Sequence, residues 1–148
     1  MNDIQPSALL EEQHQQLDRN MEQLLAGQGD LGLLQTDLRR HLYIEEALLF
    51  PLVNSRRLAM PLGIMRAEHG QMWDLLAVLD ETTDTAARRR VCQQLFELFA
   101  QHNPKEEDVI YPAIDDYHAN DHQPGSLLDD INEAELPDGW VCEARRRS

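Results

Sequence analysis

The chain has 148 residues, of which 42% are hydrophobic and 27% are charged, a balance typical of one folded domain and not of a disordered chain. Its formal net charge of -14 would repel a phosphate backbone, so we expect no nucleic-acid partner. The start of the chain lacks a secretory leader pattern, and no run approaches the ~18 apolar residues of a membrane span. We therefore expect a cytoplasmic protein without a membrane partner.

The first predicted element is a helix over residues 7–26, with Ser7 as its N-cap and with Gly27 and Gly29 after its end. Residues spaced at the helical period form one mostly apolar stripe along this helix, which consists of Leu10, His14, Leu17, Met21 and Leu24. A histidine therefore lies on the face that should pack into the core.

The second predicted helix covers residues 30–50, because Asp30 can cap its start and Pro51 disfavours helix at the residue before it. Its stripe consists of Leu34, Leu38, His41, Glu45 and Leu48. A histidine and a carboxylate, one helical turn apart, occupy positions where leucine would be expected.

The third and fourth predicted helices repeat this order. The third begins near Pro61 and runs to about Asp80, with the stripe Leu62, Met65, His69, Met72, Leu76 and Leu79. The fourth follows the turn ETTDT and stops before Pro112, with the stripe Val91, Leu95, Leu98, His102, Glu106 and Val109. Each half of the chain thus has a helix with one histidine, followed by a helix with a histidine and a glutamate.

Four helices of this length, each ~30 Å long and joined by short loops, predict an all-α protein with an antiparallel up-down-up-down four-helix bundle. We assign the bundle to residues 1–112 and an acidic C-terminal extension to residues 113–148, in which SLLDDINEAEL could form one short helix packed on the bundle. Of the two cysteines, Cys92 is expected in the core and Cys142 nearer the surface. One bundle would bring the polar stripe positions together near its middle.

The polar stripe residues are candidate metal ligands: His14, His41, Glu45, His69, His102 and Glu106. A buried, ionised carboxylate without a partner is costly, and the stripes offer no lysine or arginine. Imidazole and carboxylate ligands suit iron, zinc or manganese, and six ligands exceed the four of a structural zinc site. The ligand set therefore favours two metal ions bridged by the two glutamates.

The alternative is a bundle without metal. In that case each histidine is a core residue satisfied by a backbone carbonyl, and Glu45 and Glu106 reach solvent from the edge of their stripes. Glu46 and Glu107 are expected to be solvated or to act as outer partners of the ligands.

The repeated stretches HLYIEEALLFP and HNPKEEDVIYP differ at one telling position. The first is expected to be plain helix, with Phe50 fixing packing at its end, as Tyr111 would in the second. Pro104 lies between His102 and Glu106, where it removes one backbone donor. We expect a kinked but continuous helix; the alternative is a restart capped by Asn103, which would turn Glu106 away from the site.

The order His14, His41-x-x-x-Glu45, His69, His102-x-x-x-Glu106 resembles the hemerythrin-like domain, also called the HHE cation-binding domain, over about residues 7–112. The resemblance implies a non-haem di-iron centre bridged by Glu45, Glu106 and an oxo or hydroxo group. By the same comparison, His14 and His41 serve one iron, and His69 and His102 serve the other. Zinc or manganese could substitute for iron.

Two departures from the family bear on function. Oxygen-carrying hemerythrins have a fifth histidine four residues after the ligand of the third helix, and here that position is Trp73. The site is thus similar to those of hemerythrin-like proteins implicated in iron–sulfur-cluster repair, nitric oxide response and iron sensing. The repair proteins carry a cysteine-bearing N-terminal domain, and we expect none here because only a few residues precede the first helix.

Three functions remain open at this point. The leading hypothesis is a di-iron protein that binds or senses O2, NO or peroxide, or handles iron. The second is a redox enzyme that reduces NO, O2 or peroxide, or acts in cluster repair, with an external redox partner. The third is a regulatory interaction module, in which the metal is structural and the tail with Trp140 and Cys142 meets a partner. The pattern favours a binding protein over a turnover enzyme and leaves the oligomeric state open.

Overall fold

The computed structural model describes residues 4–120 and 126–146. Every regular element in these two stretches is helical, which confirms the predicted all-α class. In chain order the elements are α1 (Pro6–Leu25), α2 (Leu31–Tyr43), the π-helical segment η1 (Ile44–Leu49), the 3-10 turn η2 (Phe50–Leu52), α3 (Ala59–Glu81), α4 (Thr85–Lys105), the π-helical segment η3 (Glu106–Ile110), α5 (Tyr111–Ala119), α6 (Ser126–Glu133) and the 3-10 turn η4 (Glu143–Arg145).

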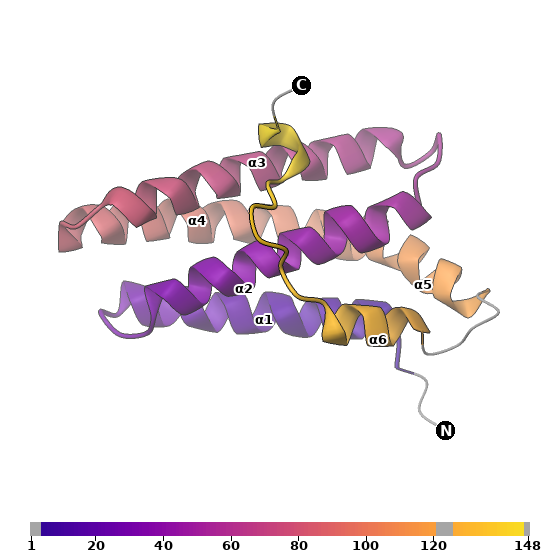
Figure 1. Cartoon of the computed structure of the whole chain (residues 1–148), viewed down its shortest axis with the longest axis horizontal. Coiled ribbons are helices and arrows are strands. Elements are labelled where there is room, and N and C mark those ends of the chain that lie inside the picture. The colour runs from indigo at the N-terminus through magenta and orange to yellow at the C-terminus, as the bar shows by residue number, and fades with distance from the viewer. Residues whose placement is uncertain (1–3, 121–125, 147–148) are drawn as a thin grey trace.

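The long helices run antiparallel in the predicted up-down-up-down order (Figure 1). Helix α1 packs against α2 and α4, and α3 packs against α4 and α2, so the four helices close around one interior. The turn between α1 and α2 has Gly27 and Gly29 at φ 83° and 90°, a region that residues with a Cβ rarely adopt. These two glycines allow the chain to reverse direction within a few residues.

The helix starts agree in part with the sequence-based expectations. The Asp30 side chain accepts a hydrogen bond from the backbone N–H of Leu33, as expected of an N-cap. The prediction for Ser7 is wrong, because α1 begins at Pro6. The backbone N–H and the hydroxyl of Ser7 instead donate to the Asp115 carboxylate at 2.9 and 2.7 Å. Ser7 therefore ties the start of α1 to α5.

Both repeated stretches contain a π-helical segment, η1 in the first half and η3 in the second. The prediction of a plain helix for the first stretch is thus wrong. Helix α4 passes through Pro104 without interruption, and Asn103 lies inside it, so the predicted continuity holds and the alternative of a restarted helix is wrong. Because η1 forms without a proline, a π-helical segment at this position does not require one. The repeated Glu-Glu pair is what the two segments share.

The fourth helical rod extends further than predicted. It was expected to stop before Pro112, but α5 continues from Tyr111 to Ala119. Pro112 lies in the first turn of α5, where a missing backbone N–H removes no helical hydrogen bond. Proline therefore marks the junction between η3 and α5 and not the end of the rod.

Two apolar clusters fill the interior, one on each side of the polar stripe positions. One cluster consists of Leu10, Ile44, Leu49, Phe50, Val53, Leu58, Leu62, Met65, Ile110, Tyr111, Ile114, Leu127 and Ile131. The other consists of Leu17, Met21, Leu34, Leu38, Leu42, Met72, Leu76, Leu79, Cys92, Leu95 and Phe99. On each long helix the candidate ligands fall between members of the two clusters. The polar layer is therefore enclosed by apolar side chains along the bundle axis.

The C-terminal extension packs on this bundle. The predicted short helix is present as α6, which buries Leu127 and Ile131 in the first cluster. The Arg40 guanidinium donates to the carbonyls of Ala134 and Ile131 at 2.8 and 3.0 Å, which holds the end of α6 against α2. The chain then crosses α2 and reaches α3, as Figure 1 shows in yellow. None of the helices in the described ranges has the length and apolar character of a transmembrane segment.

Candidate metal centre

The structure brings all six predicted residues together in the middle of the bundle. Each of their side chains is at most 2% exposed. They form two groups of four, which are His14, His41, Glu45 and Glu106, and Glu45, His69, His102 and Glu106. Within each group, the nitrogen and oxygen atoms that could bind a metal lie within 4.8 Å of one another. Both groups share Glu45 and Glu106, so the two candidate positions are adjacent.

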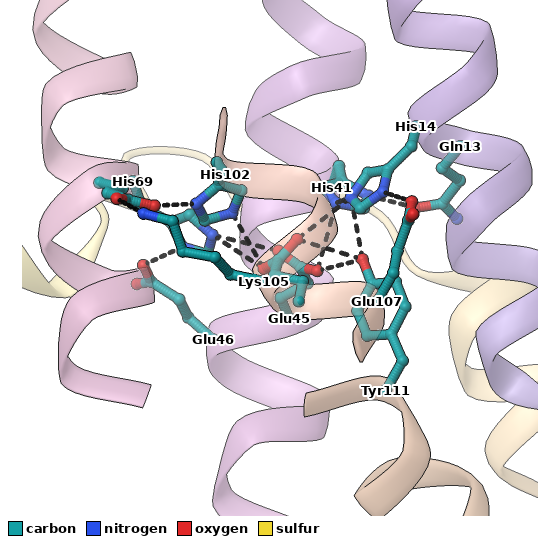
Figure 2. A network of polar contacts seen from close by, with 12 residues as sticks. Gln13, His14, His41, Glu45, Glu46, His69, His102, Lys105, Glu107 and Tyr111 are labelled. Atoms are coloured by element: carbon teal, nitrogen blue, oxygen red, sulfur yellow. Dashed lines mark hydrogen bonds and ion pairs between the residues drawn. The ribbon is translucent and has the colours of Figure 1, made fainter. Parts of the chain in front are cut away.

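The Nε2 atoms of the four imidazoles point toward the two carboxylates (Figure 2). His14 Nε2 lies 3.1 Å from Glu106 Oε1, and His69 Nε2 lies 3.1 Å from Glu45 Oε1. Within one helix, His41 Nε2 is 3.3 Å from Glu45 Oε2, and His102 Nε2 is 3.1 Å from Glu106 Oε2. Each glutamate therefore contacts histidines from both halves of the chain, as expected of a bridging ligand.

Several of these atoms are buried without a hydrogen-bond partner, because their contacts of 3.1 Å with one another lack the alignment of a hydrogen bond. They are Glu45 Oε1, Glu106 Oε2, His69 Nε2 and His102 Nε2. Buried polar atoms of native proteins are nearly always satisfied, so four in one layer require an explanation. All four belong to the group of Glu45, His69, His102 and Glu106, and a cation at that position would satisfy them with the ligand types that iron, zinc and manganese accept. The six side chains thus fit a metal centre.

A second ring of hydrogen bonds orients the imidazoles. The Nδ1 atoms of His14 and His69 lie 2.8 and 2.7 Å from the carboxylates of Glu107 and Glu46. A carboxylate partner requires the proton on Nδ1, which leaves the Nε2 lone pair free for a metal. From the sequence, Glu46 and Glu107 were expected either to be solvated or to act as outer partners of the ligands. The structure favours the second alternative, because each carboxylate contacts an imidazole. Because Glu46 and Glu107 directly follow Glu45 and Glu106 inside a π-helical segment, both members of each pair contact the site.

The other two imidazoles have partners that sequence reasoning missed. His41 Nδ1 lies 2.7 Å from Gln13 Oε1, and His102 Nδ1 lies 2.8 Å from Glu68 Oε1. Lys105 also pairs with Glu68, at 2.5 Å. The sequence offered one indication of these partners: Gln13 and Glu68 each directly precede the histidine of their own helix. The outer partners therefore correspond between the two halves of the chain. Glu46 corresponds to Glu107, and Gln13, a neutral amide, corresponds to the carboxylate of Glu68.

Tyr111 contributes a hydroxyl group on the His14 side of the site. Its Oη lies 2.6 Å from Glu45 Oε2, 2.9 Å from His14 Nε2 and 3.3 Å from Glu106 Oε1. Burial and the nearby carboxylates raise the pKa of Tyr111 well above its usual value, which keeps the phenol protonated as a donor. The packing role expected from the sequence is present, because the ring of Tyr111 stacks on His14. The sequence-based expectation did not include the hydrogen bonds of the hydroxyl. At the repeat-related position, Phe50 stacks on His69 without any polar group.

The electrostatics of the protein chain alone favour positive charge at His14, His69 and His102. Burial would lower the pKa of His14, but its hydrogen bond to Glu106 and the charges of Glu106 and Glu45 raise that pKa to about 9. The same balance raises the pKa of His69 well above its usual value. Burial opposes ionisation of Glu106, yet His102, His14 and His69 lower its pKa well below the usual range. The two carboxylates therefore require a nearby positive charge, which protonated imidazoles or bound cations can supply.

A comparison with family models agrees with the fold and with cation binding. The hemerythrin HHE cation-binding domain matches residues 5–114, which include all six side chains and the four long helices. No curated protein and no solved structure matches the chain. The match extends over most of the sequence, and the buried histidine and glutamate groups could hold a metal ion. The chain therefore belongs to the hemerythrin HHE cation-binding domain family.

Proposed function

We propose that this protein is a non-haem di-iron protein that binds or senses a small ligand, namely O2, NO or peroxide, or handles iron. One observation carries the proposal: two groups of four buried ligand side chains share Glu45 and Glu106. Shared carboxylates would hold two ions close together, which a single structural ion does not require. Zinc or manganese could occupy the same positions in place of iron.

The six side chains have distinct roles in this proposal. His14 and His41 would hold one iron, His69 and His102 the other, and Glu45 and Glu106 would bridge them. Four protein ligands leave coordination positions free on each iron. Bound iron supplies redox activity and a place for an exogenous ligand to coordinate.

The remaining residues of the site control orientation and protons. Glu46 and Glu107 hold the Nδ1 proton of His69 and His14, so that Nε2 stays available. Tyr111 presents the single proton of its hydroxyl at Glu45 Oε2, and the hydroxyl would donate it to a small polar molecule in place of Glu45. The two apolar clusters exclude water from the layer on both sides. An enclosed site with one buried donor suits a ligand of diatomic size.

Iron loading tests the proposal directly. The protein is loaded with ferrous iron under anaerobic conditions, desalted and exposed to air. We expect about two irons per chain, as the two candidate positions imply, and the absorption of an oxo-bridged di-iron centre. Glu45→Ala should abolish both, whereas Glu97→Ala, an exposed carboxylate on α4, should change neither. Well under two irons in the unchanged protein, without this absorption, would contradict the proposal.

A redox enzyme is the second candidate, and the phenol of Tyr111 beside both carboxylates is the observation that favours it. Such an enzyme would pass electrons from an external donor to NO, O2 or peroxide and would need a buried proton source at the site. Steady turnover with a chemical reductant, lost in Glu45→Ala and His102→Ala, would support it. Stoichiometric binding of the ligand without turnover would reject the enzyme and support the binding or sensing function.

The interaction-module hypothesis depends on a tail that is free to meet a partner. Cys142 is fully buried, so the expectation that it lies nearer the surface is wrong. Trp140 packs edge-on against Tyr43 and Trp73. A partner would have to displace this packing before it could bind these side chains. The arrangement instead raises the question of what the tail does for the bundle.

A further inference from the structure

The described end of the extension, residues 137–146, forms what we call the C-terminal strap. The strap lies outside the region that matches the family model, residues 5–114. It crosses α2 and runs onto α3, as Figure 1 shows. Trp140 lies between Tyr43 of α2 and Trp73 of α3, with ring centroids 5.4 and 5.6 Å apart. The strap therefore covers the side of the bundle on which α2 and α3 meet.

A chain of two hydrogen bonds connects the strap to a candidate metal ligand. The backbone N–H of Glu143 donates to Glu46 Oε1 at 2.9 Å. The second oxygen of the same carboxylate, Glu46 Oε2, lies 2.7 Å from His69 Nδ1. Glu46 therefore has one oxygen held by the strap and the other on the imidazole. Movement of the strap would release the carboxylate that orients His69.

Further contacts fix the strap at this position. The Arg145 guanidinium makes two hydrogen bonds to the Asp74 carboxylate, at 2.8 and 2.7 Å, and Arg66 pairs with Glu143 at 2.6 Å. A Cβ atom at Gly70, the residue after His69, would lie 2.9 Å from the Ala144 side chain. The strap packs so closely on α3 at this point that only glycine fits.

The other half of the site has no equivalent contact in the described ranges. Glu107 corresponds to Glu46 in the internal repeat and orients His14 in the same way. However, the Glu107 side chain is 31% exposed, whereas the Glu46 side chain is 2% exposed. The strap thus buries one of two otherwise equivalent carboxylates. A buried hydrogen bond to a charged group is stronger than an exposed one, so the halves differ in how rigidly their imidazoles are held.

We propose that the C-terminal strap is a positioning element of the metal centre, in which the backbone N–H of Glu143 holds Glu46 and Glu46 holds His69. Docking of the strap and metal binding at the half-site of His69 and His102 stabilise each other. Thermodynamic linkage requires the coupling to be reciprocal, so a bound metal also keeps the strap closed. The inference rests on the proposed two-metal function and concerns one half of that site.

Glu143→Pro removes the relevant donor with little other change. Glu143 is the first residue of the turn η4, where proline is tolerated, and Cys142 has ψ 152°, which suits the residue before a proline. Glu143→Pro also removes the ion pair with Arg66. Glu143→Gln is the matched control, because it removes that charge but keeps the backbone N–H. The difference between the two variants isolates the hydrogen bond to Glu46.

The first measurement is a stepwise cobalt(II) titration followed by absorption. We expect Glu143→Pro to weaken one of two cobalt equivalents by about 10-fold, the low end of the effect of losing an outer partner because Glu46 itself remains, and to leave the other unchanged. Glu143→Gln should titrate like the unchanged protein. Asp74→Asn, which weakens the Arg145 anchor without touching the site, should weaken the same equivalent to a smaller extent. A general loss of folding would weaken both equivalents, so selectivity distinguishes positioning from mere stability.

The second measurement is the labelling rate of the buried Cys142 thiol, in a Cys92→Ala background that removes the other cysteine. Labelling requires the strap to open. Cobalt should slow it in the unchanged protein and in Glu143→Gln, but not in Glu143→Pro. If Glu143→Pro binds two cobalt equivalents with unaltered affinity, and cobalt still slows its labelling, the inference about the strap is overturned and the proposed function is unaffected. Failure of the unchanged protein to bind cobalt would instead contradict the proposed function.

Discussion

The hydroxyl of Tyr111 donates a hydrogen bond of 2.6 Å to Oε2 of Glu45, which joins the start of α5 in the fourth helical rod to a glutamate of the second rod. The residue related to Tyr111 by the internal repeat is Phe50, which offers the site only an aromatic ring. The two halves of the centre therefore share their six central side chains but differ in hydrogen bonding. This asymmetry in hydrogen bonding lies at Tyr111 and Phe50. From the sequence, we expected the two halves to differ at Pro104.

Tyr111→Phe should destabilise the metal-free protein by about 1–3 kcal/mol, because a buried carboxylate loses a hydrogen-bond donor. Urea unfolding in the presence of a chelator measures the change. Tyr117→Phe is the control, since Tyr117 is 40% exposed and should shift the free energy of unfolding by less than ~0.5 kcal/mol. Equal effects of the two substitutions would show that the hydroxyl of Tyr111 contributes nothing to stability.

The half-sites should be separable by mutation. His14→Ala removes a ligand from one group of four and His69→Ala from the other, so each variant should retain about one metal per chain. Glu106→Ala removes a ligand from both groups and should lower the affinity for both ions. Metal analysis after desalting gives the stoichiometry. Complete loss of metal in His14→Ala alone would indicate that the two positions fill only together.

The metal-free protein should lose stability as the pH rises from about 6.5 to about 9. The pKa of His14 is raised from 6.5 to about 9 in the folded chain, so its contribution is fully present below pH 6.5 and is lost as the pH passes 9. The raised pKa values of His69 and His102 act in the same direction. Denaturant unfolding in the presence of a chelator, at several pH values, measures this. A free energy of unfolding that stays constant over this range would contradict the protonated state of these imidazoles.

Metal affinity should change in the opposite direction over the same pH range. A metal binds the neutral imidazole, so protons leave the site on binding and affinity rises with pH. Calorimetric titration in buffers of different ionisation enthalpy gives the number of protons released. His14→Gln should release fewer protons than the unchanged protein. Release that is independent of His14 would assign the protons to other groups.

Pro104→Ala should stabilise the protein by about 2 kcal/mol and leave metal stoichiometry unchanged. Alanine restores a backbone N–H in the interior of α4 and is a better helix former than proline. The π-helical segment should persist, because its counterpart η1 forms without a proline. Thermal unfolding and metal analysis test both parts. Loss of one metal would show that Pro104, and not the Glu-Glu pair, sets the geometry of η3.

The sequence by itself determined that the six candidate ligands face the interior, but the prediction for the end of the fourth stripe is wrong, because Val109 is 43% exposed. A helix has one period, so a histidine in a leucine stripe, such as His14 or His69, must point into the core wherever the helix packs. The same argument placed Glu45 and Glu106 one turn from their histidines. Asp30 was identified as a cap for a similarly local reason, because its side chain reaches the backbone N–H of Leu33.

Only the tertiary structure decided how these side chains are held. Gln13, Glu68, Glu46 and Glu107 each reach an imidazole on a different helix, and that depends on the rotation and height of two packed helices. The π-helical segments shift the buried stripe by one residue, which the helical period cannot show: Leu49 and Ile110 are buried where that period predicts Leu48 and Val109. The contact of the strap with Glu46 joins positions 97 residues apart in the chain. Local periodicity specifies the direction of a side chain, but contacts between elements depend on the packing of the whole bundle.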